Sequence, residues 1–148
     1  MQNLAERQAW MGTLAKASPA ELENCVSQLG DLPAYSFLRS PEIGLAMVRG
    51  RAGGVGDAFN LGEMTLTRCV VSLDIGEMAG FGYVGGRSPR HAELAALCDA
   101  LLQQEQWHSR VTAKVIEPLR HSQQQSAEQQ QQQTAATQVE FFTMRRGE

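Results

Sequence analysis

The chain has 148 residues, of which 43% are hydrophobic and 20% are charged, and its formal net charge is −3. This length suits one folded domain, and the composition excludes a disordered chain. A general nucleic-acid binder would carry excess positive charge, so that class is disfavoured. No run of about 20 apolar residues is present for a membrane helix, and the first residues lack a signal-peptide pattern. We therefore expect one cytoplasmic domain over residues 1–148.

Two helices are predicted near the N-terminus. Trp10 and Leu14 share one face at helical spacing. The segment 18–21, Ser-Pro-Ala-Glu, then supplies a capping serine, a proline suited to the first turn and the glutamate of a capping box. A second apolar row over 22–29 follows, and Gly30 is expected to end that helix.

The middle of the chain is predicted to form short strands. Apolar and polar residues alternate over 35–39 and 45–51, and the segment 65–73 is rich in β-branched residues. A further strand is expected over 78–84, after a turn at 74–77. Glycines separate these segments, so an antiparallel meander is indicated.

The last third returns to helical periodicity. Ser88 and Pro89 repeat the cap-plus-proline start, and an apolar stripe follows over 94–101. A further helical stretch carries Val111, Val115 and Leu119, and we expect it to end near Pro118. Helices, strands and helices again predict an α+β fold: an antiparallel β-sheet with helices packed on one face, flanked by the N-terminal and C-terminal helices.

The C-terminal region has an unusual composition. From 123 to 133, eight of eleven residues are glutamine and no apolar stripe is present, so this stretch is either a solvated helix or a linker. An apolar tail over 139–148 follows it, in which Phe141, Phe142 and Met144 are prominent. We expect these side chains to dock either on their own domain or on a partner.

A glycine-rich segment gives the first candidate site. Residues 51–56 read Arg-Ala-Gly-Gly-Val-Gly, but the lysine and the following helix of a phosphate loop are missing. A turn between strands is therefore favoured. The alternative is an anion site, formed by Arg51 and the backbone amides of Gly53 and Gly54.

The predicted start of the helix after Ser88 gives the second candidate site. Arg87, Arg90 and His91 gather there. Free backbone N–H groups and the helix dipole favour a bound phosphate or a partner's carboxylate at such a place. A plain surface cap explains the same residues equally well.

Metal and catalytic sites are not indicated. The histidines lack ligand spacing, and the three cysteines, Cys25, Cys69 and Cys98, lie among apolar neighbours without a C-x-x-C pair. We therefore expect small, buried, reduced thiols. No nucleophile elbow or paired carboxylates stand out, so the residue pattern names no catalytic set.

Several segments in fixed order resemble the PhnG family, the small subunit of the bacterial carbon–phosphorus lyase core complex. The resemblance runs from end to end of the chain. In chain order, the matching segments are Arg7-Gln8 with Trp10-Met11, Pro19-Ala20-Glu21-Leu22, Arg51 with Gly53-Gly54, Thr65-Leu66-Thr67-Arg68, Gly86-Arg87 with His91-Ala92-Glu93, Asp99-Ala100-Leu101, and Phe141-Phe142-Thr143-Met144 with Arg146-Gly147.

The resemblance implies a hetero-oligomer with PhnI, PhnH and PhnJ, a dimer of heterotetramers, with PhnL needed functionally. It implies transfer of an alkylphosphonate to the ribose of ATP, with release of adenine and formation of α-D-ribose 1-methylphosphonate 5-triphosphate. The nucleosidase centre is implied to lie in PhnI. An iron–sulfur cluster and S-adenosylmethionine are implied to lie in PhnJ.

For this chain the resemblance implies no catalytic residues, no cofactor and no metal of its own. We hypothesise that Arg51, Arg87, Arg90 and His91 face the large partner subunit, near its substrate channel or against its acidic residues. Phe141, Phe142 and Met144 would be an apolar anchor. The competing readings are a non-enzymatic interaction or scaffold module, and an independent enzyme.

Overall fold

The computed structural model describes residues 4–51, 58–76 and 78–146, and it describes their side chains except at 48–51, 58–61 and 133–146. In chain order the elements are α1 (Leu4–Lys16), α2 (Pro19–Ser27), β1 (Tyr35–Arg51), β2 (Ala58–Leu73), β3 (Ala79–Gly85), α3 (Pro89–Leu102), α4 (Glu105–Val111), the π-helical turn η2 (Thr112–Ile116) and α5 (Glu117–Arg146). The predicted α+β class is confirmed.

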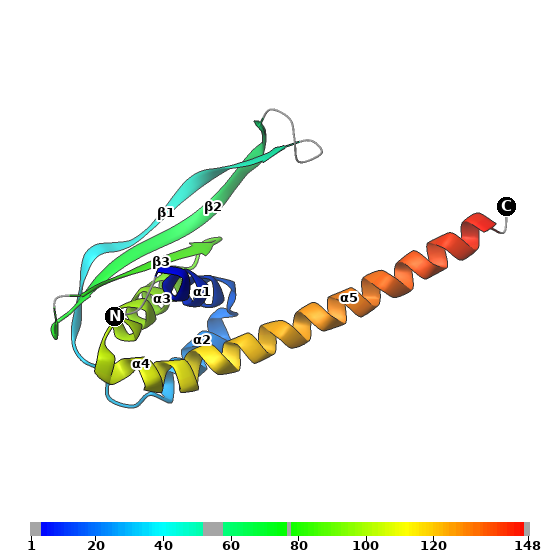
Figure 1. Ribbon diagram of the computed structural model, residues 1–148. Coiled ribbons are helices and arrows are strands. Elements are labelled where there is room, and N and C mark those ends of the chain that lie inside the picture. The colour runs from blue at the N-terminus through cyan, green and yellow to red at the C-terminus, as the bar shows by residue number, and fades with distance from the viewer. Residues whose placement is uncertain (1–3, 52–57, 77, 147–148) are drawn as a thin grey trace.

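The sheet is antiparallel, with strand order β1-β2-β3. Figure 1 shows the helical layer on one side of it, with α3 nearest the strands. Alternate residues of β2, Cys69, Val71 and Leu73, are buried on the side that faces α3. The period-two pattern of the sequence therefore identifies the buried face of the central strand.

Two glycines let α3 lie almost directly on β3. A Cβ atom on Gly80 would stand 2.0 Å from the carbonyl oxygen of Ala96, and one on Gly82 would stand 2.2 Å from that of Ala92. Both obstacles are helix backbone, which has no side-chain rotamer to move away. Glycine on the strand and alanine on the helix therefore set the separation between the two layers.

The first strand differs from the sequence prediction. The segments 35–39 and 45–51 belong to one continuous strand, β1, which passes through Pro41. The pairing with β2 shifts between Phe37 and Arg39 and again between Arg39 and Glu42. These bulges take up the extra residues, and an edge strand tolerates a proline because its outward side needs no N–H donor.

The predicted helix caps form only in part. Ser18 and Ser88 are N-cap residues and a proline follows each, but neither makes a side-chain capping hydrogen bond. The capping box at α2 is absent, because Glu21 instead accepts a hydrogen bond from Ser122, 2.9 Å away on α5. Gly30 follows α2 with φ of +80°, as expected for a helix end.

The C-terminal helices form one continuous rod from α4 through η2 to α5, so the expected end near Pro118 is wrong. The N–H of Glu117 bonds to the carbonyl of Thr112, five residues earlier. A proline clashes with the carbonyl four residues before it in a regular α-helix, and the wider π turn relieves that crowding.

The glutamine-rich stretch is the solvated helix of the two predicted alternatives. Gln123 donates to the carbonyl oxygen of Thr13 at 2.9 Å, whereas Gln124 and Gln125 bond only within the helix. Residues 125–132 are exposed. Figure 1 shows α5 leaving the rest of the chain and ending far from the sheet.

The cysteines are free thiols, as expected, and Cys69 and Cys98 are buried while Cys25 is partly buried. Burial raises the pKa of Cys69 to about 11 and that of Cys98 to about 12. Such thiols stay protonated at neutral pH and are poor nucleophiles. Within the described part of the chain, no helix is long and apolar enough to cross a membrane.

The contact between α3 and β3 gives a stability prediction. Gly80→Ala should lower the free energy of unfolding by about 1–3 kcal/mol or more, because helix backbone must move to admit the methyl group. Urea titration followed by circular dichroism measures this change. Gly44→Ala is the matched strand control, since a Cβ there meets nothing within 4 Å. Equal midpoints for the two variants would contradict the close contact.

Candidate interaction surface

The residues predicted to cluster at the start of α3 have different environments in the structure. Arg87 is exposed and makes no hydrogen bond or ion pair with any described residue. Arg90 is also exposed, but its guanidinium lies 2.9 Å from Glu23 on α2 and 3.2 Å from Glu93 on α3. Tyr35, at the start of β1, donates a hydrogen bond to Glu93. Arg90 therefore joins α2 to α3, and Arg87 keeps its donors for another molecule.

The ionisation of this cluster follows from its contacts. Hydrogen bonding from Arg90 lowers the pKa of the Glu23 carboxyl, and the same contact raises the pKa of Arg90. Burial, followed by the hydrogen bond to Glu93, raises the pKa of Tyr35. The carboxylates of Glu23 and Glu93 are thus already paired with a cation of the same chain.

His91 lies in the core, away from the surface on which we expected it. Its side chain is buried, and its Nε2 atom lies 2.9 Å from the carbonyl oxygen of Leu14 on α1. The ring therefore fastens α3 to α1 and is turned away from solvent. Its position beside two arginines in the sequence gives no sign of this burial.

The other predicted residues are only partly described. Arg51 ends β1 and pairs with Ala58, which begins β2, so the glycine-rich segment connects two paired strands. Gly53 and Gly54 lie outside the described residues. Phe141, Phe142 and Met144 lie near the end of α5, and their side chains are outside the described part of the structure.

The structure adds a surface that the sequence did not indicate. β3 pairs with β2 only from Leu66 to Ser72, whereas β1 and β2 continue beyond it as a two-stranded ribbon. We call this part, residues 44–51 paired with 58–66, the ribbon. A two-stranded hairpin is only marginally stable alone in water. A neighbouring surface would stabilise it.

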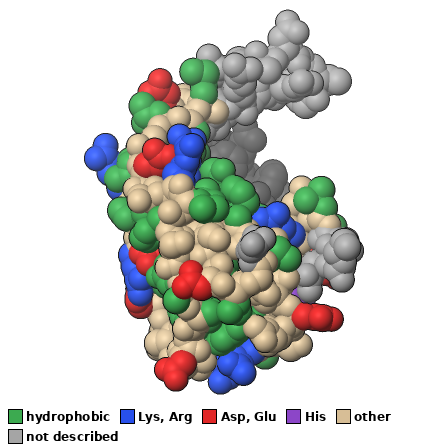
Figure 2. Space-filling model, turned by 90° about the vertical axis from the view of Figure 1, so that its left-hand side faces the viewer, with side chains coloured by type: hydrophobic (Ala, Val, Ile, Leu, Met, Phe, Trp, Pro, Cys, Tyr) green, Lys and Arg blue, Asp and Glu red, His purple; other side chains and the backbone are tan. Residues whose placement is uncertain are grey.

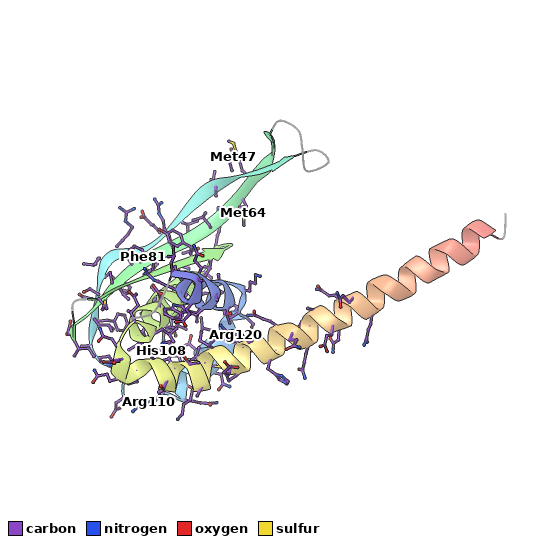
Figure 3. The ribbon with its side chains drawn as sticks, in the orientation of Figure 1. Met47, Met64, Phe81, His108, Arg110 and Arg120 are labelled. Atoms are coloured by element: carbon purple, nitrogen blue, oxygen red, sulfur yellow. The ribbon has the colours of Figure 1, made fainter. Side chains whose placement is uncertain are left out.

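Apolar side chains are exposed on and beside the ribbon. Leu45 is 69% exposed and Met47 is 54% exposed, and alternation along the strand puts both on one face of the ribbon. Met64, which pairs with Ala46, is 44% exposed on the opposite face. Figure 3 shows both methionines on the part of the hairpin that rises above β3. Figure 2 shows hydrophobic side chains lying among charged ones on one side of the molecule. Exposed apolar patches of this kind are typical of interaction sites.

The two edge strands of the sheet, β1 and β3, differ in whether side chains bond to their outer backbone groups. On β3 the N–H of Phe81 donates to Asp99 at 2.9 Å, and the carbonyl of Ala79 accepts from Gln103 at 2.9 Å. Among the described side chains, none bonds to the backbone of the 35–47 part of β1. The β1 edge therefore remains able to pair with another strand.

Residues that carry the family resemblance meet at one buried carboxylate. Asp99 is fully buried on α3 and accepts from Arg7 at 2.9 Å and from the Trp10 indole at 2.7 Å. It also accepts the N–H of Phe81. This charge is thus fully hydrogen-bonded, and it joins α1, α3 and β3. A structural role accounts for these residues without any catalytic one.

The described residues contain no group of three or more His, Cys, Asp or Glu side chains that could hold a metal. The features that remain are a free arginine, an apolar ribbon, an open strand edge and a projecting helix. This set suits contact with other chains.

Comparison with known proteins agrees with the resemblance. A family model described as "Phosphonate metabolism protein PhnG" matches residues 5–147. A protein of Rhizobium meliloti (strain 1021) is 41% identical over 153 residues, which cover 98% of this chain and 92% of that protein. It is named "Alpha-D-ribose 1-methylphosphonate 5-triphosphate synthase subunit PhnG".

The Asp99 network gives the second prediction. Asp99→Asn should lower the free energy of unfolding by about 3–5 kcal/mol, because it leaves a guanidinium and two buried N–H donors without their charged acceptor. Chemical denaturation measures the loss. Arg39→Gln is the control, since it breaks an exposed ion pair with Glu42 and should cost less than about 1 kcal/mol. A loss from Asp99→Asn as small as the control's would show that the carboxylate is dispensable.

Proposed function

Because the chain belongs to the PhnG family of phosphonate metabolism proteins, we propose that it serves as a subunit of an α-D-ribose 1-methylphosphonate 5-triphosphate synthase. The observation that carries this proposal is the end-to-end match with a relative of that name, at 41% identity. A synthase subunit works within a multi-subunit enzyme. The surfaces of this chain support such a role more than independent catalysis.

We propose further that its partners are PhnI, PhnH and PhnJ, with PhnL needed for activity. In this assembly an alkylphosphonate replaces adenine on the ribose of ATP. The iron–sulfur cluster and S-adenosylmethionine belong to a partner subunit, and the assembly works in the cytoplasm. The chain itself supplies contact surfaces and, at most, positive charge beside the substrates.

Arg87 is the described side chain best suited to that electrostatic role. It is exposed at the start of α3 and pairs with no described residue. A dianionic phosphonate or a triphosphate needs fixed donors, and arginine binds such groups with two parallel hydrogen bonds. A carboxylate of the partner would be held in the same way. Arg90 contributes less, because Glu23 and Glu93 already occupy it.

The ribbon and α5 are suited to holding the assembly together. Both extend from the body of the molecule (Figure 1), so they reach neighbouring chains that a compact domain would not. The ribbon offers exposed apolar side chains, and α5 carries the apolar tail from Val139 onward. Buried apolar anchors supply much of the binding energy in protein interfaces.

The ribbon gives a prediction with a close control. Leu45→Glu should leave the stability of the isolated chain within about 0.5 kcal/mol of the wild type, because the side chain is exposed. It should nevertheless reduce recovery of the chain with co-expressed PhnI, PhnH and PhnJ by about tenfold. Leu4→Glu is matched, since Leu4 and Leu45 are both 69% exposed. Equal recovery of the two variants would exclude the ribbon from the interface.

Deletion of residues 139–148 and the substitution Arg87→Ala test the other two surfaces. We expect the deletion to weaken assembly, and Arg87→Ala to slow adenine release from ATP and methylphosphonate or to weaken assembly. Arg39→Ala, which removes an arginine already paired with Glu42, should do neither. Unchanged assembly and adenine release in both test variants would contradict these roles. Full activity of the assembly without this chain would favour a scaffold module.

A further inference from the structure

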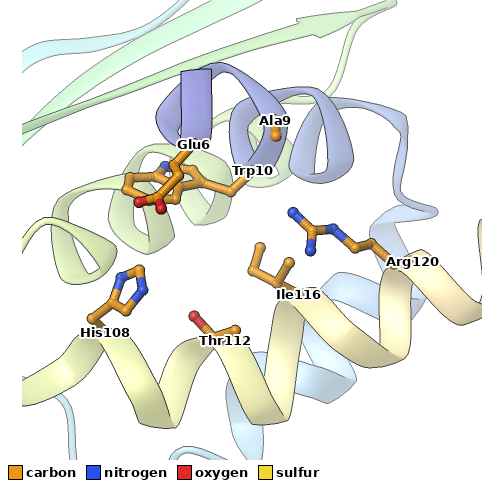
Figure 4. Close-up of a pocket in the computed structure, with 7 residues that line it drawn as sticks. All are labelled: Glu6, Ala9, Trp10, His108, Thr112, Ile116 and Arg120. Atoms are coloured by element: carbon orange, nitrogen blue, oxygen red, sulfur yellow. The ribbon is translucent and has the colours of Figure 1, made fainter. Parts of the chain in front are cut away.

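A cavity of about 230 Å³ lies between α1 and the rod formed by α4, η2 and α5 (Figure 4). One wall consists of Glu6, Ala9 and Trp10 from α1, and the other consists of His108, Thr112, Ile116 and Arg120 from the rod. No surface discussed above includes this cavity. Its lining combines an indole ring with charged and hydrogen-bonding side chains, which is typical of small-molecule sites.

The rod residues lie at intervals of four, at positions 108, 112, 116 and 120. In a regular α-helix each four-residue step turns about 40° past a full turn, so such a row drifts around the helix. The step from 112 to 116 crosses the π turn, which holds more residues per turn, so the drift there is in the opposite sense. The π turn thus keeps the row facing α1. Isolated π turns are frequent at functional sites.

Two polar atoms in this row are available to a ligand. The Nδ1 atom of His108 lies 2.9 Å from the carbonyl oxygen of Leu102, so Nδ1 carries the proton and donates. In the neutral ring Nε2 is then an acceptor. Neither this Nε2 nor the Thr112 hydroxyl has a partner among the described residues. Figure 4 shows both side chains directed into the space beneath α1.

The apolar part of the cavity lining is held in place by contacts within the chain. The indole N–H of Trp10 is held by Asp99 at 2.7 Å, and its ring meets the His108 ring edge-on with centroids 5.7 Å apart. Ile116 supplies apolar surface on the opposite wall, which belongs to the rod. A carbon skeleton can pack there without any rearrangement of the protein.

The two ends of the cavity differ in charge. Glu6 and His108 lie at one end, and the Arg120 guanidinium extends toward the cavity from the other end (Figure 4). Arg120 is 47% exposed, and its contact with Glu117, at 3.6 Å, is long. Such an exposed pair is worth little, so a ligand's anionic group can compete for the guanidinium.

We propose that this cavity binds a small organic anion that carries hydroxyl groups. The anionic group pairs with Arg120. A hydroxyl group donates to His108 Nε2 and accepts from Thr112, and the carbon skeleton packs on Trp10 and Ile116. This binding mode does not depend on the assembly proposed above.

The test uses the full-length chain with Trp107→Phe, which leaves Trp10 as the single tryptophan. Glycerol 3-phosphate is the probe because it carries both an anionic group and hydroxyl groups. We expect a saturable change in Trp10 fluorescence with a dissociation constant on the order of 1 mM. Glycerol and inorganic phosphate each supply one half of the recognised groups, and each should bind at least about tenfold more weakly.

Variants then locate the binding. Arg120→Gln should weaken binding about tenfold, and Thr112→Val should weaken it about fivefold while keeping the shape of the side chain. Arg110→Gln is the control, because this arginine stacks on residue 107 and does not line the cavity. Urea midpoints equal to that of the parent verify folding. The proposal is overturned if glycerol 3-phosphate gives no saturable signal, if phosphate alone binds as tightly, or if Arg120→Gln binds no more weakly than Arg110→Gln.

Discussion

The carboxylate of Asp99 is the interaction on which the arrangement of the layers depends. It is fully buried, and it accepts hydrogen bonds from a guanidinium, an indole and a backbone amide that belong to α1 and β3. A buried charge is tolerated only when it is satisfied in this way. The same carboxylate occupies the N–H of Phe81 at the β3 edge and fixes the indole of Trp10. The position of α1, the hydrogen bonding at the β3 edge and the orientation of Trp10 in the cavity therefore all depend on Asp99.

The helical side of the molecule is tightly packed, whereas other parts are left uncovered by the chain itself. The glycine contacts of β3 with α3 and the buried His91 make the helical side compact. By contrast, the ribbon, the β1 edge and residues 124–132 of α5 have little or no cover from the chain itself. A single small domain gains nothing in stability from such extensions. Their presence is understandable if neighbouring chains complete the structure, as expected for a subunit.

Local patterns in the sequence were enough for the class of the fold and for most of its elements. The apolar rows gave the helices, and the alternation in 65–73 gave the buried face of the central strand. The continuity of β1 through Pro41 was missed because bulges belong to a pair of strands and leave no mark on one strand alone. The predicted helix end near Pro118 was wrong for a related reason. The π turn that accommodates this proline has no sequence signature of its own.

The candidate site was harder to predict than the fold. In the sequence, Arg87 and His91 both look like surface residues at a helix start. Only the packing of α1 against α3 shows that Arg87 is exposed and that His91 is buried in the core. Leu45 and Met47 lie where β1 and β2 continue past the end of β3, and the predicted central strand over 65–73 did not indicate that β2 begins at Ala58. Likewise Arg7, Trp10 and Asp99 lie far apart in sequence, so their common network could not be read from spacing.

The solvated part of α5 makes the reach and the angular setting of the C-terminal tail depend on the count of glutamines. Each residue added or removed changes the length by about 1.5 Å and rotates everything beyond it by about 100°. A loss of two residues would turn the tail to nearly the opposite side of the helix axis, whereas a loss of seven would shorten it by about two turns and almost restore its direction. If the tail anchors a neighbouring chain as proposed, variation in the number of glutamines has to preserve its rotational phase as well as its reach.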